Sequence, residues 1–285
     1  MKLLLLVIIL GCSCLYSAEN FRIIYIIHGD GNYLFHDKDG KSLNAAGRIL
    51  EQAKLNAENI NRGEVFIFYQ KPAEKFLFFN KDDGEFYYYK NSELISEETY
   101  SRKDADNFET EAGLIKKYSE DKSFSKKNIL LYYGHEIPLN DSSGYHNSYP
   151  QKVFGINIFA DGLGRIINSL SNDEKFNLIV LSTCRNGNEN FASVLSLFTN
   201  YLIASPADIH LSYMDSGSLI SLIENTNSIA QLSEEFARSA FEKLINSTHT
   251  EISINLYDLD DGSITEFYRA PEFGIRKKES AENSE

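Results

Sequence analysis

The sequence predicts an α/β protein, a three-layer αβα sandwich around a mostly parallel β-sheet, within one domain of residues 19–275. Two observations predict this fold class. Several apolar runs are nearly continuous rather than alternating, which is typical of strands buried on both faces of a parallel sheet. Segments with helical apolar spacing lie between these runs, and such strand–helix alternation is typical of a parallel sheet with helices on its faces.

Six apolar segments are expected to form strands, and the first five would make the buried centre of the sheet. They are residues 21–27, 64–69, 128–133, 176–182, 201–205 and 251–257. Apolar residues at helical spacing predict helices in five further segments. These are 43–60, 108–118, 156–170, 191–197 and 218–245, the last being one long helix or two short ones that break near Asn225.

The segment between the second and third core strands predicts an antiparallel β-hairpin insertion. Its two arms, residues 76–79 and 85–89, are rich in Phe and Tyr. Asp83 and Gly84 lie between the arms, and Asp-Gly is a strong signal for a two-residue hairpin turn. We therefore expect the chain to turn at these two residues.

The two ends of the chain differ from the domain between them. Lys2 precedes an unbroken apolar run and a series of small residues, so residues 1–18 are predicted to be a signal peptide, cleaved after Ala18. Alternatively, Leu10-Gly11-Cys12 resembles a bacterial lipobox, which would place a lipid anchor at Cys12. Both interpretations predict an exported protein that is secreted, periplasmic or anchored at the bacterial cell envelope. The charged tail of residues 276–285 is expected to be disordered.

Composition excludes one class of function. The formal net charge is -13, and no cluster of Lys and Arg interrupts the acidic background. Nucleic-acid binding needs such clusters to neutralise phosphates, so we expect no nucleic-acid partner. The chain is 42% hydrophobic and 24% charged, and a domain of this length buries enough surface to fold without a cofactor or a disulfide.

One cysteine remains in the mature chain. Cys12 and Cys14 lie in the predicted targeting segment, which leaves Cys184. A lone thiol in an exported protein is an inert buried residue, an intermolecular linker or a reactive group. Free cysteine is among the most buried residue types, so the sequence around Cys184 has to decide between these interpretations.

Cys184 and His135 occupy equivalent places in the predicted fold. Each follows a core strand directly, and the two residues are 49 positions apart. Functional sites in parallel sheets form at the carboxyl ends of strands, and the separation is close to the roughly 50 residues typical of caspases. A thiol has an ordinary pKa of about 8.5 and needs a base to become a good nucleophile. The sequence therefore predicts Cys184 as nucleophile and His135 as its base.

Neighbouring groups have predicted supporting roles. The backbone N–H groups of Gly134, Glu136 and Cys184 are candidates for an oxyanion hole. Asn190 is the expected N-cap of the helix that follows Cys184, and the N-terminus of that helix would favour a thiolate. Arg185 adds positive charge, although a solvated loop residue is the simpler interpretation.

Two further groups of residues have alternative interpretations. His28 and Asp30 follow the first strand and would either line the cleft and contact substrate or form a strand-ending turn. Residues 37–40 and 258–262 look like calcium loops, but neither carries the later Glu of an EF-hand. Loop or hairpin turns are the simpler interpretation of both.

The layout resembles the clostripain-like cysteine peptidases, relatives of caspases, gingipains and legumains. The resemblance covers most of the mature chain. It is carried by the order of the strands and helices, by residues 130–135 and 178–184, which end on His135 and Cys184, and by the strand at 201–205. It implies a caspase-like fold, a His135/Cys184 dyad and endopeptidase activity on protein or peptide substrates, in many relatives after Arg or Lys. No cofactor is implied, but calcium stays open because some relatives use it.

Departures from the family pattern leave the function with alternatives. Glu136 stands where the family usually has Gly, and Ser182 stands where an acidic residue often forms the floor of the S1 pocket. Asp208 is the remaining acidic candidate for binding a basic P1 side chain. Three functions follow: an exported cysteine endopeptidase acting through a thioester acyl-enzyme, a catalytically impaired caspase-like domain acting as a surface binding module, and a thiol-dependent hydrolase or transferase for other substrates.

Overall fold

The computed structural model describes most of the predicted domain. The described residues are 20–31, 34–36, 42–102, 107–119, 126–170, 175–209, 216–225, 228–247 and 251–270. The predicted signal peptide, Cys12, the calcium-like loop at 37–40 and the tail at 276–285 lie outside these residues. None of the helices in the described part is long and apolar enough to cross a lipid bilayer.

A nine-stranded sheet forms the centre of the described fold, in the order β15-β14-β13-β12-β9-β1-β4-β7-β8. Its middle strands run parallel to one another. They are β1 (Asn20–His28), β4 (Gly63–Gln70), β9 (Lys126–Tyr133), β12 (Phe176–Ser182) and β13 (Thr199–Ala204). An antiparallel pair extends each side of this parallel centre. These pairs are β7 (Gly84–Lys90) with β8 (Glu93–Tyr100), and β14 (Ile252–Asp258) with β15 (Ile264–Arg269).

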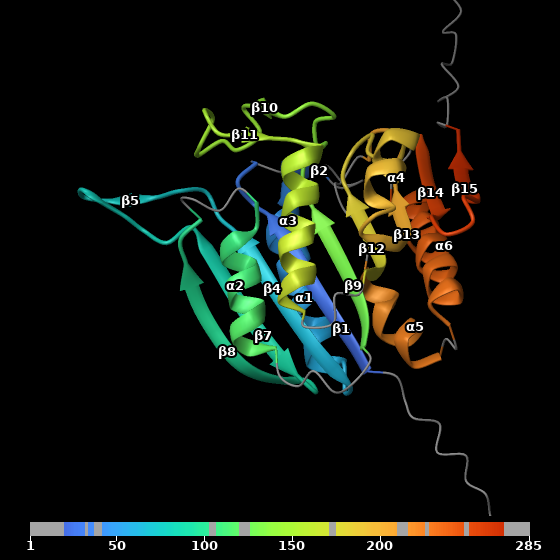
Figure 1. Cartoon of the computed structure of the whole chain (residues 1–285), viewed down its shortest axis with the longest axis horizontal. Coiled ribbons are helices and arrows are strands. Elements are labelled where there is room, and N and C mark those ends of the chain that lie inside the picture. The colour runs from blue at the N-terminus through green and yellow to red at the C-terminus, as the bar shows by residue number, and fades with distance from the viewer. Residues whose placement is uncertain are drawn as a thin grey trace, which may run out of the picture.

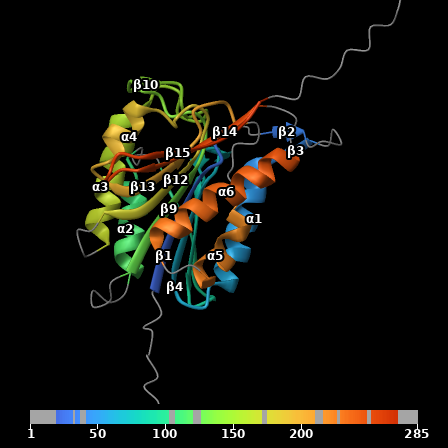
Figure 2. The ribbon, with the colours of Figure 1, turned by 90° about the vertical axis from the view of Figure 1, so that its right-hand side faces the viewer.

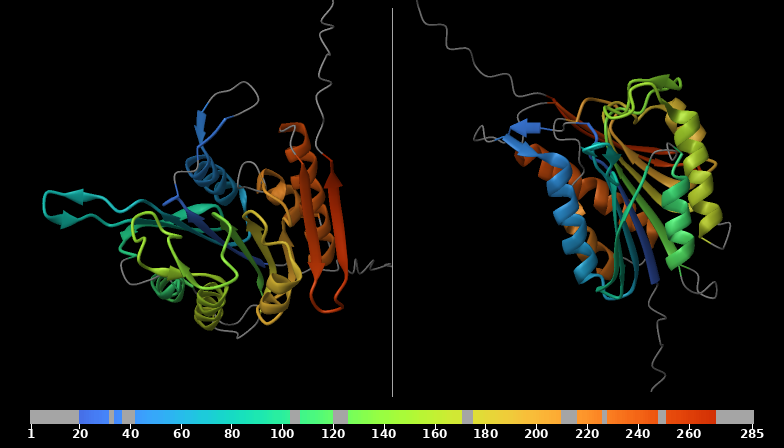
Figure 3. Two further views of the ribbon diagram at one scale, coloured as in Figure 1. Left: turned by 90° about the horizontal axis from the view of Figure 1, so that it is seen from above. Right: turned by 90° about the vertical axis from the view of Figure 1, so that its left-hand side faces the viewer.

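Helices cover both faces of the sheet, as Figures 2 and 3 show. One face carries α1 (Ala45–Asn59), the short 3-10 helix Ser216–Ser218, α5 (Leu219–Asn225) and α6 (Ile229–Ser247). The other carries α2 (Glu109–Tyr118), α3 (Ile156–Ser169) and α4 (Glu189–Leu195).

Alternating side chains of β1 supply both cores. Ile23, Tyr25 and Ile27 pack into the first core, and Ile24 and Ile26 into the second. The strand is apolar on both sides because both sides are covered. The predicted three-layer sandwich is therefore confirmed.

The hairpin prediction was wrong about which strands pair and where the chain turns. Gly84 does not form a turn but begins β7, and the chain turns instead at Asn91 and Ser92 to enter β8. Both turn residues have positive φ, 49° and 68°, as a type I′ turn requires. Because β7 also pairs with β4 on its other side, the tyrosine-rich segment is a full member of the main sheet.

A separate small hairpin precedes β7. It consists of β5 (Lys75–Phe76) and β6 (Phe79–Asn80), and it projects away from the body of the molecule (Figure 1). Its tip carries four consecutive large apolar side chains that are 63–96% exposed. Two other short pairs lie in the loops: β2 (Leu34–His36) with β3 (Ser42–Asn44), and β10 (Ser142–Ser143) with β11 (Val153–Phe154).

The strand order reverses next to β1. From β1 the chain passes to β4 on one side, whereas β9, β12 and β13 follow one another on the other side. Loops that leave the carboxyl ends of β1 and β9 therefore diverge, which opens a crevice at this edge of a parallel sheet. The loops that follow β1, β9, β12 and β13 all reach this edge, and it is where the candidate site lies.

Candidate active site

His135 and Cys184 leave the sheet from adjacent strands at the same level. β9 and β12 pair directly, with Tyr133 opposite Ser182 as the last partners. The Gly134 N–H then donates to the Ser182 carbonyl at 3.3 Å. His135 and Cys184 each follow two residues after that last pair. The expectation that their strands are neighbours is confirmed.

The His135 ring is exposed and is oriented by the loop that follows β1. Its Nε2 lies 3.1 Å from the carbonyl oxygen of Gly31. Because a carbonyl only accepts, Nε2 carries the proton in this contact. The other ring nitrogen, Nδ1, is then the atom that can accept a proton from a thiol.

The Cys184 thiol is half-buried and lies against the loop that follows β13. Its Sγ is 3.7 Å from the carbonyl oxygen of Ile209. Burial raises the pKa of the thiol, and the negative charges of Asp208 and Glu136 raise it further, while Arg185 opposes them. In the free protein Cys184 is therefore held as a thiol, and a base is needed to generate the nucleophile.

A charged bridge spans the loops beside Cys184. Arg185 lies 2.8 Å from Asp208 and 3.8 Å from Glu136, and all three side chains are exposed. The backbone of Arg185 has a positive φ of 54°, which is uncommon for a residue with a side chain. Asp208, predicted to bind a basic substrate side chain, is thus bound to a guanidinium of the chain itself.

The predicted oxyanion-hole donors are not equivalent. The Gly134 N–H is engaged with the Ser182 carbonyl. Within the described part of the chain, neither the Glu136 nor the Cys184 N–H group donates a hydrogen bond, so these two remain the candidate donors. Ser182 itself is fully buried, which places its side chain below the edge of the sheet rather than on a substrate-facing surface.

Comparison with solved structures places this geometry in a known fold. The chain superposes on an inactive zymogen of a C11 protease from Parabacteroides distasonis with a TM-score of 0.58 and 17% sequence identity. The match covers 85% of this chain and 62% of that one. The chain has the C11 protease fold. C11 is the clostripain family, so the caspase-like fold implied by the sequence resemblance is confirmed.

Two further structures share the C11 fold, both of a secreted C11 cysteine protease from Bacteroides thetaiotaomicron. One holds an irreversible peptide inhibitor and aligns with a TM-score of 0.56 and 12% identity, over 85% of this chain and 67% of that one. The other, named iotapain, aligns with a TM-score of 0.56 and 13% identity, over 86% and 67%. The sequence matches no family model and no curated protein. The chain spans about 62% of the length of the Parabacteroides protease.

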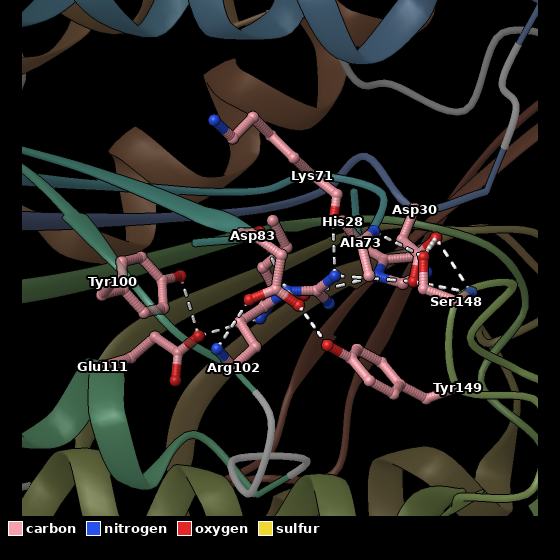
Figure 4. Close-up of polar contacts among 11 residues, drawn as sticks. His28, Asp30, Lys71, Ala73, Asp83, Tyr100, Arg102, Glu111, Ser148 and Tyr149 are labelled. Atoms are coloured by element: carbon pink, nitrogen blue, oxygen red, sulfur yellow. Dashed lines mark hydrogen bonds and ion pairs between the residues drawn. The ribbon is translucent and has the colours of Figure 1, made fainter. Parts of the chain in front are cut away.

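Within the C11 fold, Asp30 is a structural anchor. It is 1% exposed, and its carboxylate accepts hydrogen bonds from the Ser148 hydroxyl at 2.7 Å and from the Ser148 N–H at 3.2 Å. Arg102 lies 3.4 Å away, and it also binds Asp83 and the Lys71 carbonyl. Figure 4 shows the Ser148 contacts ending on Asp30 and the Arg102 guanidinium reaching toward Asp30, Asp83 and the Lys71 backbone. Burial and full pairing give Asp30 a role in fixing loops and not in reaching substrate.

His28 is buried in the same region, on the side facing α2 and α3. Its ring packs against Tyr145 and His146, and its Nδ1 lies 3.3 Å from the Gln70 side-chain oxygen. Gln70 in turn donates to the buried carboxylate of Glu111. Burial lowers the pKa of His28 well below its ordinary value, and His146 and Arg102 lower it further. The neutral His28 ring therefore packs under the β10–β11 loop, against Tyr145 and His146.

The N-cap prediction for α4 was displaced by two residues. Asn188, not Asn190, caps the helix, and its side-chain oxygen accepts from the N–H groups of Asn190 and Phe191 at 3.1 and 3.2 Å. Asn188 has the extended backbone of an N-cap residue. Asn190 already belongs to the first turn.

The described residues contain no group of three or more His, Cys, Asp or Glu side chains that could hold a metal ion. In the predicted calcium-like loop at 258–262, Asp258 accepts from the N–H groups of Asp260 and Asp261. That carboxylate therefore closes the turn between β14 and β15. Calcium use stays an open alternative, and the absence of a cofactor stays a prediction.

Sequence reasoning missed two residues that shape the site. Arg102 is 72 positions from Asp30, and no local pattern links them. Asn186 lies two residues after Cys184 and is 1% exposed. A buried amide in a loop rich in asparagine carries no distinctive sequence signal beyond its position between the predicted nucleophile and the following helix.

Proposed function

We propose that this chain is an exported cysteine endopeptidase that cleaves peptide bonds with Cys184 as nucleophile and His135 as general base. The observation that carries the proposal is that each of these residues follows the last paired residue of two adjacent parallel strands by two positions. The proteases that share this fold, one of them described with a peptide inhibitor, support a peptide substrate. Export is supported by the signal-like residues 1–18 and by the secreted Bacteroides relative.

The reaction follows from the positions of the polar groups. His135 takes the thiol proton at Nδ1 as Sγ attacks the substrate carbonyl carbon. The resulting oxyanion is bound by the N–H groups of Glu136 and Cys184. The C–N bond then breaks, the imidazolium returns its proton to the leaving amine, and a thioester remains on Cys184. Water, deprotonated by His135, attacks the thioester and releases the carboxylic acid and the free thiol.

The order of events matters because of the local charge. Burial and the two nearby carboxylates hold Cys184 as a thiol before substrate arrives. Proton transfer to His135 therefore accompanies attack instead of preceding it. The same carboxylates, Glu136 and Asp208, favour a substrate with Lys or Arg at P1, which would replace Arg185 as their cation.

A second candidate is the catalytically impaired binding module. The raised pKa of Cys184 and the internal pairing of Asp208 with Arg185 favour it. One of the structures with this fold is itself an inactive zymogen. In this alternative the same cleft binds a peptide without cleaving it.

The decisive experiment compares fluorogenic peptide libraries cleaved by wild type, Cys184→Ala and His135→Ala, with and without calcium. We expect turnover by wild type and a loss of at least about 1000-fold in both variants, because each removes a group that acts as part of one unit. Circular dichroism should show all three proteins folded. Equal turnover by wild type and Cys184→Ala would reject the proposal, and peptide binding without turnover would select the second candidate.

Export has its own measurement. N-terminal sequencing and mass spectrometry of the mature protein from a bacterial host should show a chain that begins at Glu19. A chain that begins at a lipidated Cys12 would identify the anchored form. An unprocessed N-terminus in the cytoplasmic fraction would reject export.

A further inference from the structure

Asn186 joins the loop that carries the nucleophile to the loop that carries the base. Its side-chain oxygen accepts from the Ile137 N–H at 2.9 Å, and its side-chain NH2 donates to the Ile137 carbonyl at 2.9 Å. Asn186 is 1% exposed and Ile137 is fully buried. Two hydrogen bonds to one residue fix orientation as well as distance, since they cannot both persist if either loop rotates.

The two hydrogen bonds between Asn186 and Ile137, here called the clamp, continue the parallel register of β9 and β12. Tyr133 pairs with Ser182 in the ladder, Glu136 meets Arg185 as an ion pair, and Ile137 meets Asn186 through the amide. Each of these contacts joins residues that are 49 positions apart, as His135 and Cys184 are. The dyad therefore lies inside a frame closed by backbone pairing on one side and by Asn186 on the other.

The two loops differ in what else holds them. The Cys184 loop is tied to β13 and the loop after it by backbone hydrogen bonds, from the Arg185 N–H to Ala207 and from the Gly187 N–H to Ser205. The exposed Glu136–Arg185 pair is a weak restraint. The His135 loop has contacts of its own, from Nε2 to Gly31 and from the Tyr145 hydroxyl to the His135 carbonyl, but these do not reach the Cys184 loop. Loss of the Asn186 amide would therefore let the two loops shift relative to each other while each keeps its other contacts.

We infer that Asn186 is a positioning residue that sets the place of His135, and of the Glu136 N–H, relative to the Cys184 sulfur. The inference rests on the proposed peptidase function. Its physical basis is that proton transfer and oxyanion binding need their groups within a few tenths of an ångström of the productive geometry. Asp208 and the rest of the loop after β13 do not depend on this clamp, so the binding of substrates with a neutral P1 residue should not depend on it either.

The first test measures kcat and KM for wild type, Asn186→Ala and the matched control Asn56→Ala on a peptide with a neutral P1 residue, after titration of active sites with an irreversible thiol probe. Asn56 is likewise a buried amide with two side-chain hydrogen bonds, to Tyr25 and Gln52, but it lies on α1, so its variant loses stability without touching either loop. We expect Asn186→Ala to lower kcat per active site at least about 30-fold with KM changed less than threefold. We expect Asn56→Ala to keep kcat within about twofold. Unchanged kcat in Asn186→Ala, at equal active-site content, overturns the inference.

The second test uses Asn186→Asp, which is nearly isosteric. The ionised carboxylate cannot donate to the Ile137 carbonyl, but the neutral carboxylic acid can donate and accept as the amide does. The activity of this variant relative to wild type at the same pH should therefore rise as the pH falls from 8 to 5. A purely structural role predicts a constant ratio, and a constant ratio overturns the inference.

A third measurement separates failure of this inference from failure of the proposed function. If wild type cleaves no peptide, the rate at which a peptidyl chloromethyl ketone alkylates Cys184 is divided by the rate for iodoacetamide. A ratio lowered in Asn186→Ala toward that of His135→Ala supports the clamp in the absence of turnover. A ratio equal to that of wild type overturns it.

Discussion

Arg185 directly follows Cys184, and its guanidinium binds the Asp208 carboxylate at 2.8 Å. Both side chains are more than half exposed, so water screens their attraction and a substrate cation can compete for the carboxylate. Under the proposed function, Arg185 therefore competes with a basic P1 side chain for the Asp208 carboxylate.

Removal of this competitor should improve the binding of basic substrates. For Arg185→Ala we expect KM for peptides with Arg at P1 to fall, by no more than about fivefold because exposed ion pairs are weak. Peptides with neutral P1 residues should show no such change. Arg238→Ala is the matched control, since Arg238 forms an equally exposed pair with Glu234 at 2.8 Å on α6. A KM that is unchanged or higher would show that Asp208 does not bind P1.

The thiol of Cys184 should ionise only at a higher pH than an ordinary thiol. Because burial and the charges of Asp208 and Glu136 raise its pKa, iodoacetamide alkylation of the free protein should reach half its limiting rate above the ordinary thiol value of about 8.5. Asp208→Asn and Glu136→Gln should each move this midpoint to lower pH. A wild-type midpoint at or below that of a model thiol would contradict the geometry of these carboxylates.

Acid should destabilise the protein through His146. Burial lowers the pKa of this histidine to about 4, with contributions from Arg102 and Lys152. The unfolded chain takes up the proton near pH 6.5 and the folded chain only near 4, so stability is present above pH 6.5 and is lost as the pH falls through this window. The loss is on the order of 3 kcal/mol.

Urea denaturation between pH 7 and pH 4 measures this loss. In His146→Gln the neutral amide does not titrate, so its free energy of unfolding should fall less steeply with acid than that of wild type. Equal slopes for the two proteins would show that His146 is already protonated in the folded state or is not buried.

The buried pair of Asp30 and Arg102 should be worth far more than an exposed one. Their side chains are 1% and 4% exposed, and removal of one partner of such a pair typically costs about 3–5 kcal/mol. We expect this loss in the free energy of unfolding of Asp30→Ala, together with faster proteolysis within residues 142–154. Glu74→Ala, which breaks an exposed pair with Lys81, should cost no more than about 1 kcal/mol. Similar small losses in both variants would contradict the assigned anchoring role.

The parts of the fold that depend on burial were predictable from the sequence. The core strands read as continuous apolar runs because helices cover both of their faces, as β1 illustrates with Ile23 and Ile24 in opposite cores. His135 and Cys184 were predictable for a related reason. Two polar residues that directly follow neighbouring buried parallel strands must lie at the same edge of the sheet.

Features that depend on contacts distant in sequence were not predictable. Asp30 was left with two interpretations, substrate contact or a strand-ending turn, because its partner Arg102 could not be identified from the sequence. The sequence predicted a turn at Asp83 and Gly84 because Asp-Gly is the stronger local turn signal. In the structure the turn lies at Asn91 and Ser92, because β7 pairs with β4 on one side and β8 on the other. The cap of α4 was ambiguous because three asparagines lie within five residues.

The clamp by Asn186 changes which lengths of chain the site can tolerate. The 49-residue interval between His135 and Cys184 includes the core elements α3 and β12 and the loop that anchors Asp30 through Ser148. Insertions in the rest of that interval would lengthen the path without moving His135 or Cys184. Deletion of one residue between His135 and Ile137, or between Cys184 and Asn186, would shift the clamp by one position and turn a side chain away from its partner. In a protein engineered on this scaffold, loop lengths in the long interval can therefore vary outside these fixed parts, whereas the two short intervals cannot vary at all.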